Sequence, residues 1–238
     1  FFGQAGLTEF YFRIAPSRHV GRNKIMSTSI DIIPVSTIEI TFGDVIVESE
    51  NQINKFLKSI GINKTIRLSV NIHDKNETYV NTVLESDKFE WKENEYAWFV
   101  VDGISGGTDG ICETLISNDI DPDNPWWIVE MLESGNNKIS GIRQKLEYAK
   151  KHNRLWYFRR SAGQPAIIAL SYGLISGSIA KLTNGILWSD DGAWDSNFFP
   201  AESTEFLNNY FRPDMSTTDT PDAEWAREGI DSIKKELA

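Results

Sequence analysis

Apolar residues recur along this chain with two periods, and each period predicts a different kind of element. Ile53, Phe56, Leu57 and Ile60 are spaced like the buried face of an amphipathic helix, which Gly61 would end. Alternating or β-branched apolar runs are instead typical of strands, whose side chains point to opposite faces in turn. Such runs predict strands, or a hairpin in the first case, at residues 37–47, 65–72, 96–101, 126–132, 155–158 and 186–188.

The C-terminal half adds four predicted helices that differ in how much of their surface is apolar. Residues 165–182 are apolar on nearly every face, which predicts a helix at the centre of the core, although the run is too short to span a bilayer. Residues 138–151, 202–211 and 220–237 each carry one apolar stripe. Because strands and helices alternate without a repeated βαβ unit, we expect an α+β fold: a mixed β-sheet with flanking helices and one buried central helix at 165–182.

The first 25 residues differ from the rest of the chain. They are basic, show no clean hydrophobic period, and precede Met26, which resembles an ordinary bacterial start running into a strand. We expect residues 1–25 to be a non-native or poorly structured N-terminal extension. Residues 26–238 would form a single α+β domain, or two lobes at 26–125 and 126–238.

Charge is distributed unevenly along an acidic chain. The 238 residues have a formal net charge of −10, while 40% are hydrophobic and 24% charged, as in ordinary globular proteins. Between residues 26 and 137 there are twenty acidic and seven basic residues, whereas 138–160 holds eight basic residues and one acidic. A large acidic section repels phosphate backbones, which argues against nucleic-acid binding. It favours a basic partner, or simply solubility.

Familiar catalytic motifs are missing from the sequence. The glycine-rich run at 103–110 lacks the Lys-Ser/Thr of a phosphate loop, so it predicts a plain loop. The histidines His19, His73 and His152 lie outside metal-binding spacings, and there is no GxSxG motif. The single cysteine, Cys112, fits a small buried residue better than a nucleophile, and an unpaired cysteine fits a reducing cytoplasm. We therefore predict no catalytic, metal-binding or cofactor-binding residues, and a non-enzymatic role over an enzymatic one.

The sharpest candidate site lies within residues 182–213. This run combines three aspartates with seven aromatic residues, a density that indicates either a specific structure or a specific surface. Three carboxylates so close together could hold a divalent metal ion or act in acid–base catalysis, but no nearby histidine or glutamate completes such a site. A structural role or a partner contact is therefore favoured. The predicted partner-binding residues are Trp188, Asp190, Asp191, Trp194 and Asp195.

The stretch GILWSDDGAWDSNFFPAESTEFLNNYFRP, residues 185–213, resembles the tails of bacterial proteins encoded beside polymorphic or contact-dependent toxins. Such proteins are immunity factors. The resemblance implies a cytoplasmic, acidic, non-enzymatic protein that neutralises one cognate toxin by occluding its active site. Its partner would be a basic toxin domain, with neither nucleic acid nor membrane involved. No residue roles can be transferred, because the resemblance carries no catalytic signature.

Two other functions stay open at this point. A metal-dependent hydrolase could use the same aspartate cluster together with Asp102 or Glu113. A structural or regulatory subunit could instead self-associate through the edge of its sheet. The sequence does not predict the oligomeric state.

Overall fold

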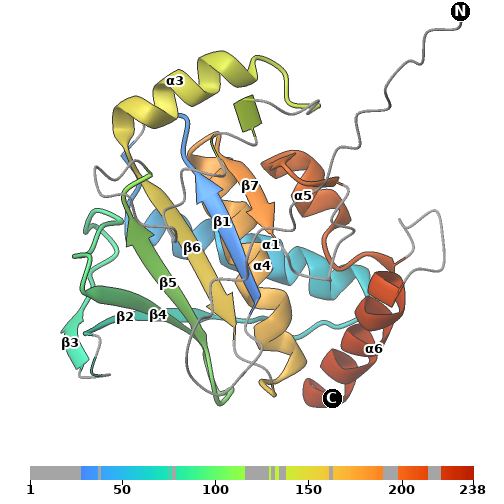
Figure 1. The fold of residues 1–238 in the computed structure, drawn as a ribbon. Coiled ribbons are helices and arrows are strands. Elements are labelled where there is room, and N and C mark those ends of the chain that lie inside the picture. The colour runs from blue at the N-terminus through green and yellow to red at the C-terminus, as the bar shows by residue number, and fades with distance from the viewer. Residues whose placement is uncertain are drawn as a thin grey trace, which may run out of the picture.

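One sheet of eight strands forms the frame of the molecule (Figure 1). The computed structural model describes residues 28–36, 39–74, 76, 79–115, 129, 132–133, 138–160, 163–189, 198–213 and 221–238. The strands are β1 (Thr28–Ile33), β2 (Leu68–Asp74), β3 (Tyr79–Thr82), β4 (Glu95–Val101), β5 (Thr108–Glu113), β6 (Leu155–Arg160), β7 (Ile186–Ser189) and β8 (Ala201–Glu202). The described helices are α1 (Phe42–Ser59), α3 (Ile142–His152), α4 (Ala166–Leu182), α5 (Ser203–Asn209) and α6 (Pro221–Glu236).

The α+β fold predicted from the sequence is confirmed, including its buried central helix. The strand order is β3-β2-β4-β5-β6-β1-β7-β8, and every described pairing is antiparallel, where the sequence had suggested a mixed sheet. Because β1 lies between β6 and β7, strands from both halves of the chain share the sheet. Residues 1–25, the expected extension, lie outside the described residues.

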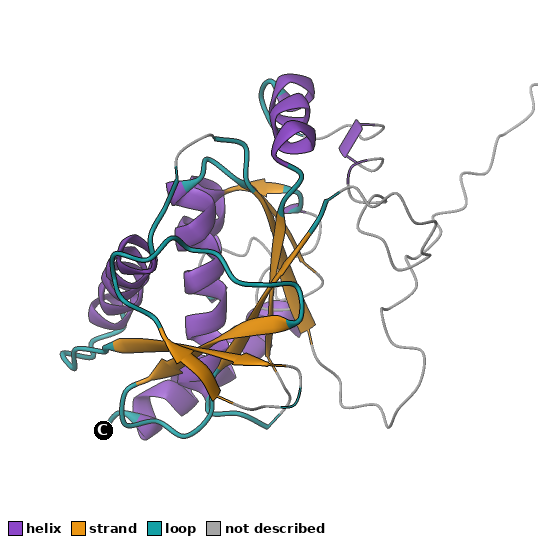
Figure 2. Ribbon diagram, turned by 90° about the vertical axis from the view of Figure 1, so that its left-hand side faces the viewer, coloured by secondary structure: helices purple, strands orange, loops and turns teal. Residues whose placement is uncertain are grey.

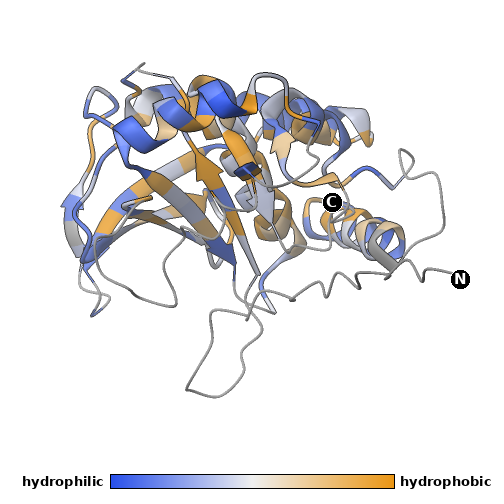
Figure 3. Ribbon diagram, turned by 45° about the horizontal axis from the view of Figure 1, so that its top comes forward, coloured by the Kyte–Doolittle hydropathy of each residue, from blue (hydrophilic) through white to orange (hydrophobic). Residues whose placement is uncertain are grey.

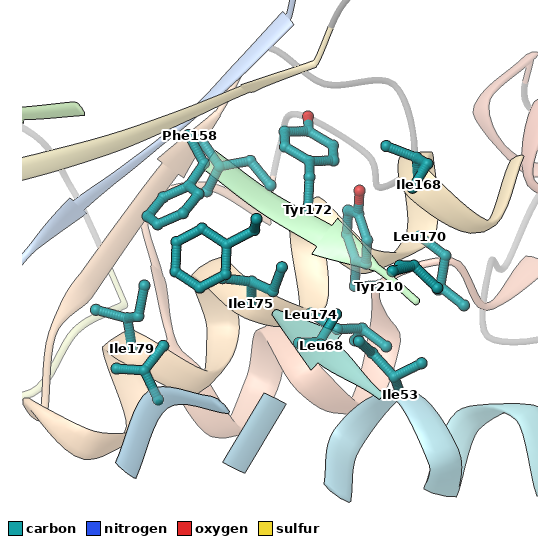
Figure 4. Packing of buried hydrophobic residues seen from close by; sticks show 14 of the residues in the cluster. Ile53, Leu68, Phe158, Ile168, Leu170, Tyr172, Leu174, Ile175, Ile179 and Tyr210 are labelled. Carbon is teal, nitrogen blue, oxygen red and sulfur yellow. The ribbon is translucent and has the colours of Figure 1, made fainter. Parts of the chain in front are cut away.

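Helix α4 is buried along nearly its whole length because other elements enclose it on several sides. It contacts β1, β6 and β7 of the sheet and also α1, α5 and α6. Figure 4 shows its side chains leaving the helix in several directions, among them Tyr172, Leu174 and Ile179, toward neighbours such as Phe158 of β6 and Ile53 of α1. Viewed from the side, the helices that enclose α4 lie with it on one side of the sheet (Figure 2).

The three buried serines of α4 are satisfied within the helix itself. The hydroxyl groups of Ser171, Ser176 and Ser178 each donate a hydrogen bond to the carbonyl four residues earlier. A buried hydroxyl without a partner would cost free energy, and this local bonding avoids that cost. The helix can therefore carry three buried serines at the centre of an otherwise apolar core.

Position 173 of α4 requires glycine, because the ring of Tyr210 lies directly against the helix backbone there. A Cβ atom at Gly173 would lie 2.0 Å from Cε1 of Tyr210, well inside van der Waals contact. The Tyr210 hydroxyl donates to the carbonyl of Ala169 at 3.3 Å, and the ring stacks on Phe206 with centroids 4.7 Å apart. The short helix α5 and the residues after it are thus seated directly on the backbone of α4.

The predicted strand or hairpin at 37–47 is wrong over its second half, because α1 already begins at Phe42. Thr41 caps this helix: its hydroxyl oxygen accepts from the backbone N–H of Asp44 at 3.1 Å, and the Asp44 carboxylate accepts from the backbone N–H of Thr41 at 2.9 Å. This capping box outweighs the β-branched composition of the segment. The predicted strand at 126–132 lies almost entirely outside the described residues.

A second, smaller core lies on the opposite face of the sheet, beneath α3. Leu146 and Ala149 of α3 belong to the same buried cluster as Ile33 of β1, Leu155 of β6 and Ile186 of β7. The outward side of α3 is hydrophilic and carries its basic residues (Figure 3). This helix therefore covers only one end of the face that α4 leaves uncovered. Among the described helices, none combines the length and the apolar run that a membrane crossing needs.

Candidate functional site

A hollow on the sheet face opposite α4 is the most distinctive surface of the described structure. Its volume is about 770 Å³. We call it the sheet-face pocket, and its lining residues are His73, Glu93, Glu95, Tyr96, Trp98, Asp109, Ile111, Glu113, Tyr157 and Arg159. The volume falls within the range of known ligand sites, roughly 300–1,000 Å³.

The alternation of side chains along the strands places most of these residues on one face. In β4, Ala97 and Phe99 are buried under the helices, so Tyr96 and Trp98 point the other way. In β6, Phe158 is buried in the same core, so Tyr157 and Arg159 join them on the pocket side. The pocket is therefore the reverse side of the same strands that build the main core.

Strand register assembles one row of the pocket from residues far apart in the sequence. Trp98 of β4 lies opposite Asp109 of β5, and Asp109 lies opposite Arg159 of β6. The Arg159 guanidinium donates to the Asp109 carboxylate, with Nε 3.1 Å from Oδ2. This pair neutralises one carboxylate of the pocket and fixes the Arg159 side chain against the sheet.

A second row, of His73, Tyr96, Ile111 and Tyr157, runs beside the first and is mainly aromatic. The imidazole of His73 stacks on the ring of Tyr96, with centroids 5.4 Å apart and planes 20° apart. Tyr96 meets Trp98 edge to face at 6.4 Å. Further along the row, Tyr157 lies opposite Ile111. All five side chains are half-buried, as is typical of aromatic residues that supply contact area at protein interfaces.

Carboxylates gather at one end of the pocket. Glu95 is held by Lys92, whose backbone N–H lies 3.0 Å and whose Nζ lies 3.5 Å from the Glu95 carboxylate oxygens. The carboxylates of Glu93 and Glu113 form no hydrogen bond or ion pair within the described part of the chain. The strands β4 and β5 are antiparallel, so the start of β4 and the end of β5 bring these acidic residues to the same end. That end therefore carries uncompensated negative charge.

Only one of the predicted partner-binding residues lies within the described structure. Trp188 is half-buried in β7 and lies opposite Asp31 of β1, which in turn lies opposite Tyr157. Trp188 is thus on the same face as the pocket, two strands beyond Tyr157. The other four residues, Asp190, Asp191, Trp194 and Asp195, lie outside the described residues, so their role stays a prediction.

The two acidic residues invoked for a hydrolase lie at different ends of the sheet. Asp102 directly follows β4 and is exposed, whereas Glu113 ends β5, which runs in the opposite direction. Within the described ranges, no group of three or more histidine, cysteine, aspartate or glutamate side chains is placed to hold a metal ion. The hydrolase hypothesis depends on aspartates that the structure does not describe.

A smaller hollow of about 230 Å³ lies near the ends of β1 and β6, and its lining includes Trp156 and His152. Its charged side chains form ion pairs with one another. Lys88 lies 3.0 Å from Glu39, and Arg154 lies 3.4 Å from Glu90. Charges satisfied in this way leave little to attract a ligand, so we regard the sheet-face pocket as the stronger candidate.

The single cysteine does not have the properties of a nucleophile. Burial, the largest cause, and the nearby carboxylates of Glu90 and Glu113 together raise the pKa of the Cys112 thiol to about 11, against the lowering effect of Arg154. The thiolate is the reactive form, so a thiol with this pKa is inert near neutral pH.

Sequence reasoning missed most of the pocket. The strands predicted at 65–72, 96–101 and 155–158 correspond to β2, β4 and β6, but the plain loop predicted at 103–110 is wrong at its end, because β5 begins at Thr108 and supplies Asp109, Ile111 and Glu113. Nothing in the sequence pairs Trp98 with Arg159, because these residues meet only through β5. Alternation within 96–101 could have marked Tyr96 and Trp98 as facing away from the core. Comparison of the chain with protein-family models, with curated proteins and with solved structures finds no match.

Proposed function

We propose that this chain is a non-enzymatic protein-binding protein whose sheet-face pocket receives a basic partner. The observation that carries the proposal is the combination, in one hollow, of half-buried aromatic side chains with the uncompensated carboxylates of Glu93 and Glu113. Aromatic side chains provide binding energy at the centre of protein interfaces. Carboxylates around them favour a partner of opposite charge and disfavour acidic competitors.

In its most specific form, the proposal is that the protein is an immunity protein acting in the cytoplasm. It would neutralise a cognate bacterial toxin by occluding the toxin's active site. Two features support this form: the resemblance of residues 185–213 to such proteins, and the position of Trp188 on the same face as the pocket. The excess of acidic residues between 26 and 137 fits a basic toxin domain.

The mechanism would divide between long-range and short-range forces. The acidic section would speed the encounter with a basic toxin, an effect that falls as salt screens the charges. At contact, Trp98, Tyr96 and Tyr157 would be covered by the partner, and their burial would slow dissociation. Neutralisation then follows from exclusion of the toxin's substrate, with no chemical step on this chain.

The test begins with capture of the partner from native lysate on the tagged protein, at low and at moderate salt. The captured polypeptide would be identified by mass spectrometry and then expressed in a bacterial host with and without this chain. We expect a basic polypeptide that arrests growth alone and permits growth when this chain is present. A captured protein that is harmless to the host, or growth arrest that this chain does not relieve, would refute the immunity role.

A further inference from the structure

We infer that the sheet-face pocket is the binding site for one arginine side chain of the partner. This inference rests on the proposed function, since it names the group by which a basic partner would be recognised. It goes further because it assigns the two parts of an arginine to two parts of the pocket. The aliphatic stem would lie along the apolar floor, and the guanidinium would meet the carboxylates at one end.

The floor of the pocket suits a long side chain with an apolar stem. Ile111 and Tyr157 lie opposite each other on β5 and β6, between the Arg159–Asp109 pair at one end and the acidic residues at the other. Arginine buries its three methylene groups against apolar surface while its head group stays with polar partners. The pocket therefore offers the apolar stretch and the charged end in the order that an arginine presents them.

The acidic end suits a planar cation better than a point charge. Glu93 and Glu113 come from different segments, the turn before β4 and the end of β5, and neither carboxylate is paired within the described residues. A guanidinium has five N–H donors in a fixed plane and can bond more than one carboxylate at once, whereas the lysine ammonium is compact and strongly hydrated. Two carboxylates at the same end of the pocket, one from the turn before β4 and one from β5, favour the planar group.

Aromatic rings in this chain repeatedly accept a guanidinium. Arg154 lies 5.6 Å from the ring centre of Trp156, Arg160 lies 5.0 Å from that of Trp225, and Arg212 lies 4.8 Å from that of Phe56. Such contacts add cation–π attraction to apolar packing. In the pocket, Tyr96 provides the same kind of surface next to Glu95 at the acidic end, and Trp98 provides it at the end of the Arg159–Asp109 pair.

The charged residues that line the pocket argue against an anionic ligand. The cation that lines it, Arg159, is already bound to Asp109. An anion would meet Glu93, Glu95 and Glu113 without a compensating donor, which would cost binding energy. The chemistry of the lining thus favours a cation at the end where the carboxylates gather.

The experiment titrates the full chain with a blocked tripeptide, acetyl-Gly-Arg-Gly-amide, and follows the indole N–H signals by NMR. The signal of Trp98 is assigned from its loss in the variant W98F. Two matched peptides replace arginine by citrulline, which has the same shape without the charge, and by lysine. We expect the arginine peptide to shift the Trp98 signal, the lysine peptide to bind about threefold more weakly, and citrulline to bind about tenfold more weakly.

The variants isolate the two carboxylates without removing packing. In E93Q/E113Q, both carboxylates become amides of nearly the same shape, and affinity for the arginine peptide should fall about tenfold. The control E224Q/E228Q makes the same change in charge on exposed positions of α6, on the far side of the sheet, and should leave affinity unchanged. Thermal unfolding of all variants verifies that the fold is kept.

The outcomes separate this inference from the proposed function. Equal binding of the citrulline peptide, equal or tighter binding of the lysine peptide, or no effect of E93Q/E113Q would overturn the arginine site. If a toxic partner is captured and neutralised but binds E93Q/E113Q as tightly as the parent protein, the inference fails while the proposed function stands. If the arginine peptide behaves as expected but no growth arrest is relieved, the site stands and the immunity role fails.

Discussion

The two faces of the sheet are built from the same strands but serve different ends. One face is closed by α1, α4, α5 and α6 and is apolar almost throughout, with Phe158 and Phe99 fully buried. Among the described helices, α3 covers the other face at one end, and this face carries aromatic rings beside carboxylates in the sheet-face pocket. Residues next to each other in one strand therefore have different surroundings: one is packed in the main core, and its neighbour lines the sheet-face pocket.

The strongest test of this difference between the two faces is to truncate two adjacent residues of β6. Phe158→Ala should lower the free energy of unfolding by about 4 kcal/mol, because it empties a buried ring from the main core. Tyr157→Ala, one position away on the half-buried face, should lower it by about 1 kcal/mol. Urea denaturation measures both values, and similar losses for the two variants would show that the pocket face is as structural as the core.

A second test concerns the close approach of α5 to α4. Gly173→Ala should lower the free energy of unfolding by about 3 kcal/mol, since the added Cβ would collide with the Tyr210 ring. The matched test combines it with Tyr210→Leu, which removes the ring. Because Tyr210→Leu removes the ring that the added Cβ would strike, the double variant should lose clearly less stability in chemical denaturation than the sum of the single losses. Additive losses would contradict the predicted contact.

A third test compares two ion pairs that differ in exposure. Asp109→Asn should lower the free energy of unfolding by about 1 kcal/mol, because it leaves Arg159 without its partner on the pocket face. Glu39→Gln, which breaks the well-exposed pair with Lys88, should cost less than about 0.5 kcal/mol. Both losses of stability should be smaller when denaturation is measured at high salt than at low salt. A larger loss of stability for Glu39→Gln than for Asp109→Asn would contradict the expectation that the Asp109–Arg159 pair is the more stabilising of the two.

The smallest expected effect is chemical and concerns Cys112, which faces the main core while its neighbours Ile111 and Glu113 line the pocket. With a pKa of about 11 against the ordinary 9.0, the thiol has about a hundredfold smaller thiolate fraction at neutral pH. Alkylation by iodoacetamide should therefore be much slower than for a free cysteine peptide, and unfolding in urea should restore the ordinary rate. Rapid alkylation of the folded protein would show that this side of β5 is open.

The same pKa gives a direction for the pH dependence of stability. The folded state holds the Cys112 proton up to pH values near 11, whereas the unfolded chain releases it near 9. The unfolded state then binds fewer protons, so the free energy of unfolding should fall as pH rises from 9 to 11 and be unaffected by this group below 9. Cys112→Ala removes the group, and its stability measured over the same pH range should lack this part of the decline.

Elements with a strong local signal could be predicted from the sequence, whereas the candidate site could not. The buried helix α4 follows from apolar residues on all sides, and α6 from its single stripe. The start of α1 was missed because the β-branched residues at 45–47 suggested a strand, although Thr41 and Asp44 form a capping box. The capping box therefore determines where the helix begins, despite the β-branched composition of the segment.

The pocket depends on strand pairing, which local patterns do not encode. Trp98, Asp109 and Arg159 share a row only because β4, β5 and β6 are neighbours in a particular register. A shift by one residue in any of these pairings would turn the row toward the core. Trp188, one of the predicted partner-binding residues, lies on the face of the sheet that carries the pocket, but nothing in the sequence identified the strands beside it.

The position of β1 has a consequence for how the chain is made. This strand is synthesised before all the others, yet its two neighbours, β6 and β7, leave the ribosome only after more than a hundred further residues. At ordinary translation speeds the wait is on the order of ten seconds. For that time an apolar strand with both edges unpaired is exposed to neighbouring nascent chains, and the sheet can close only when its first strand is inserted between two of its last. The topology thus delays closure of the sheet until most of the chain has been synthesised, as expected where strand pairing is non-local.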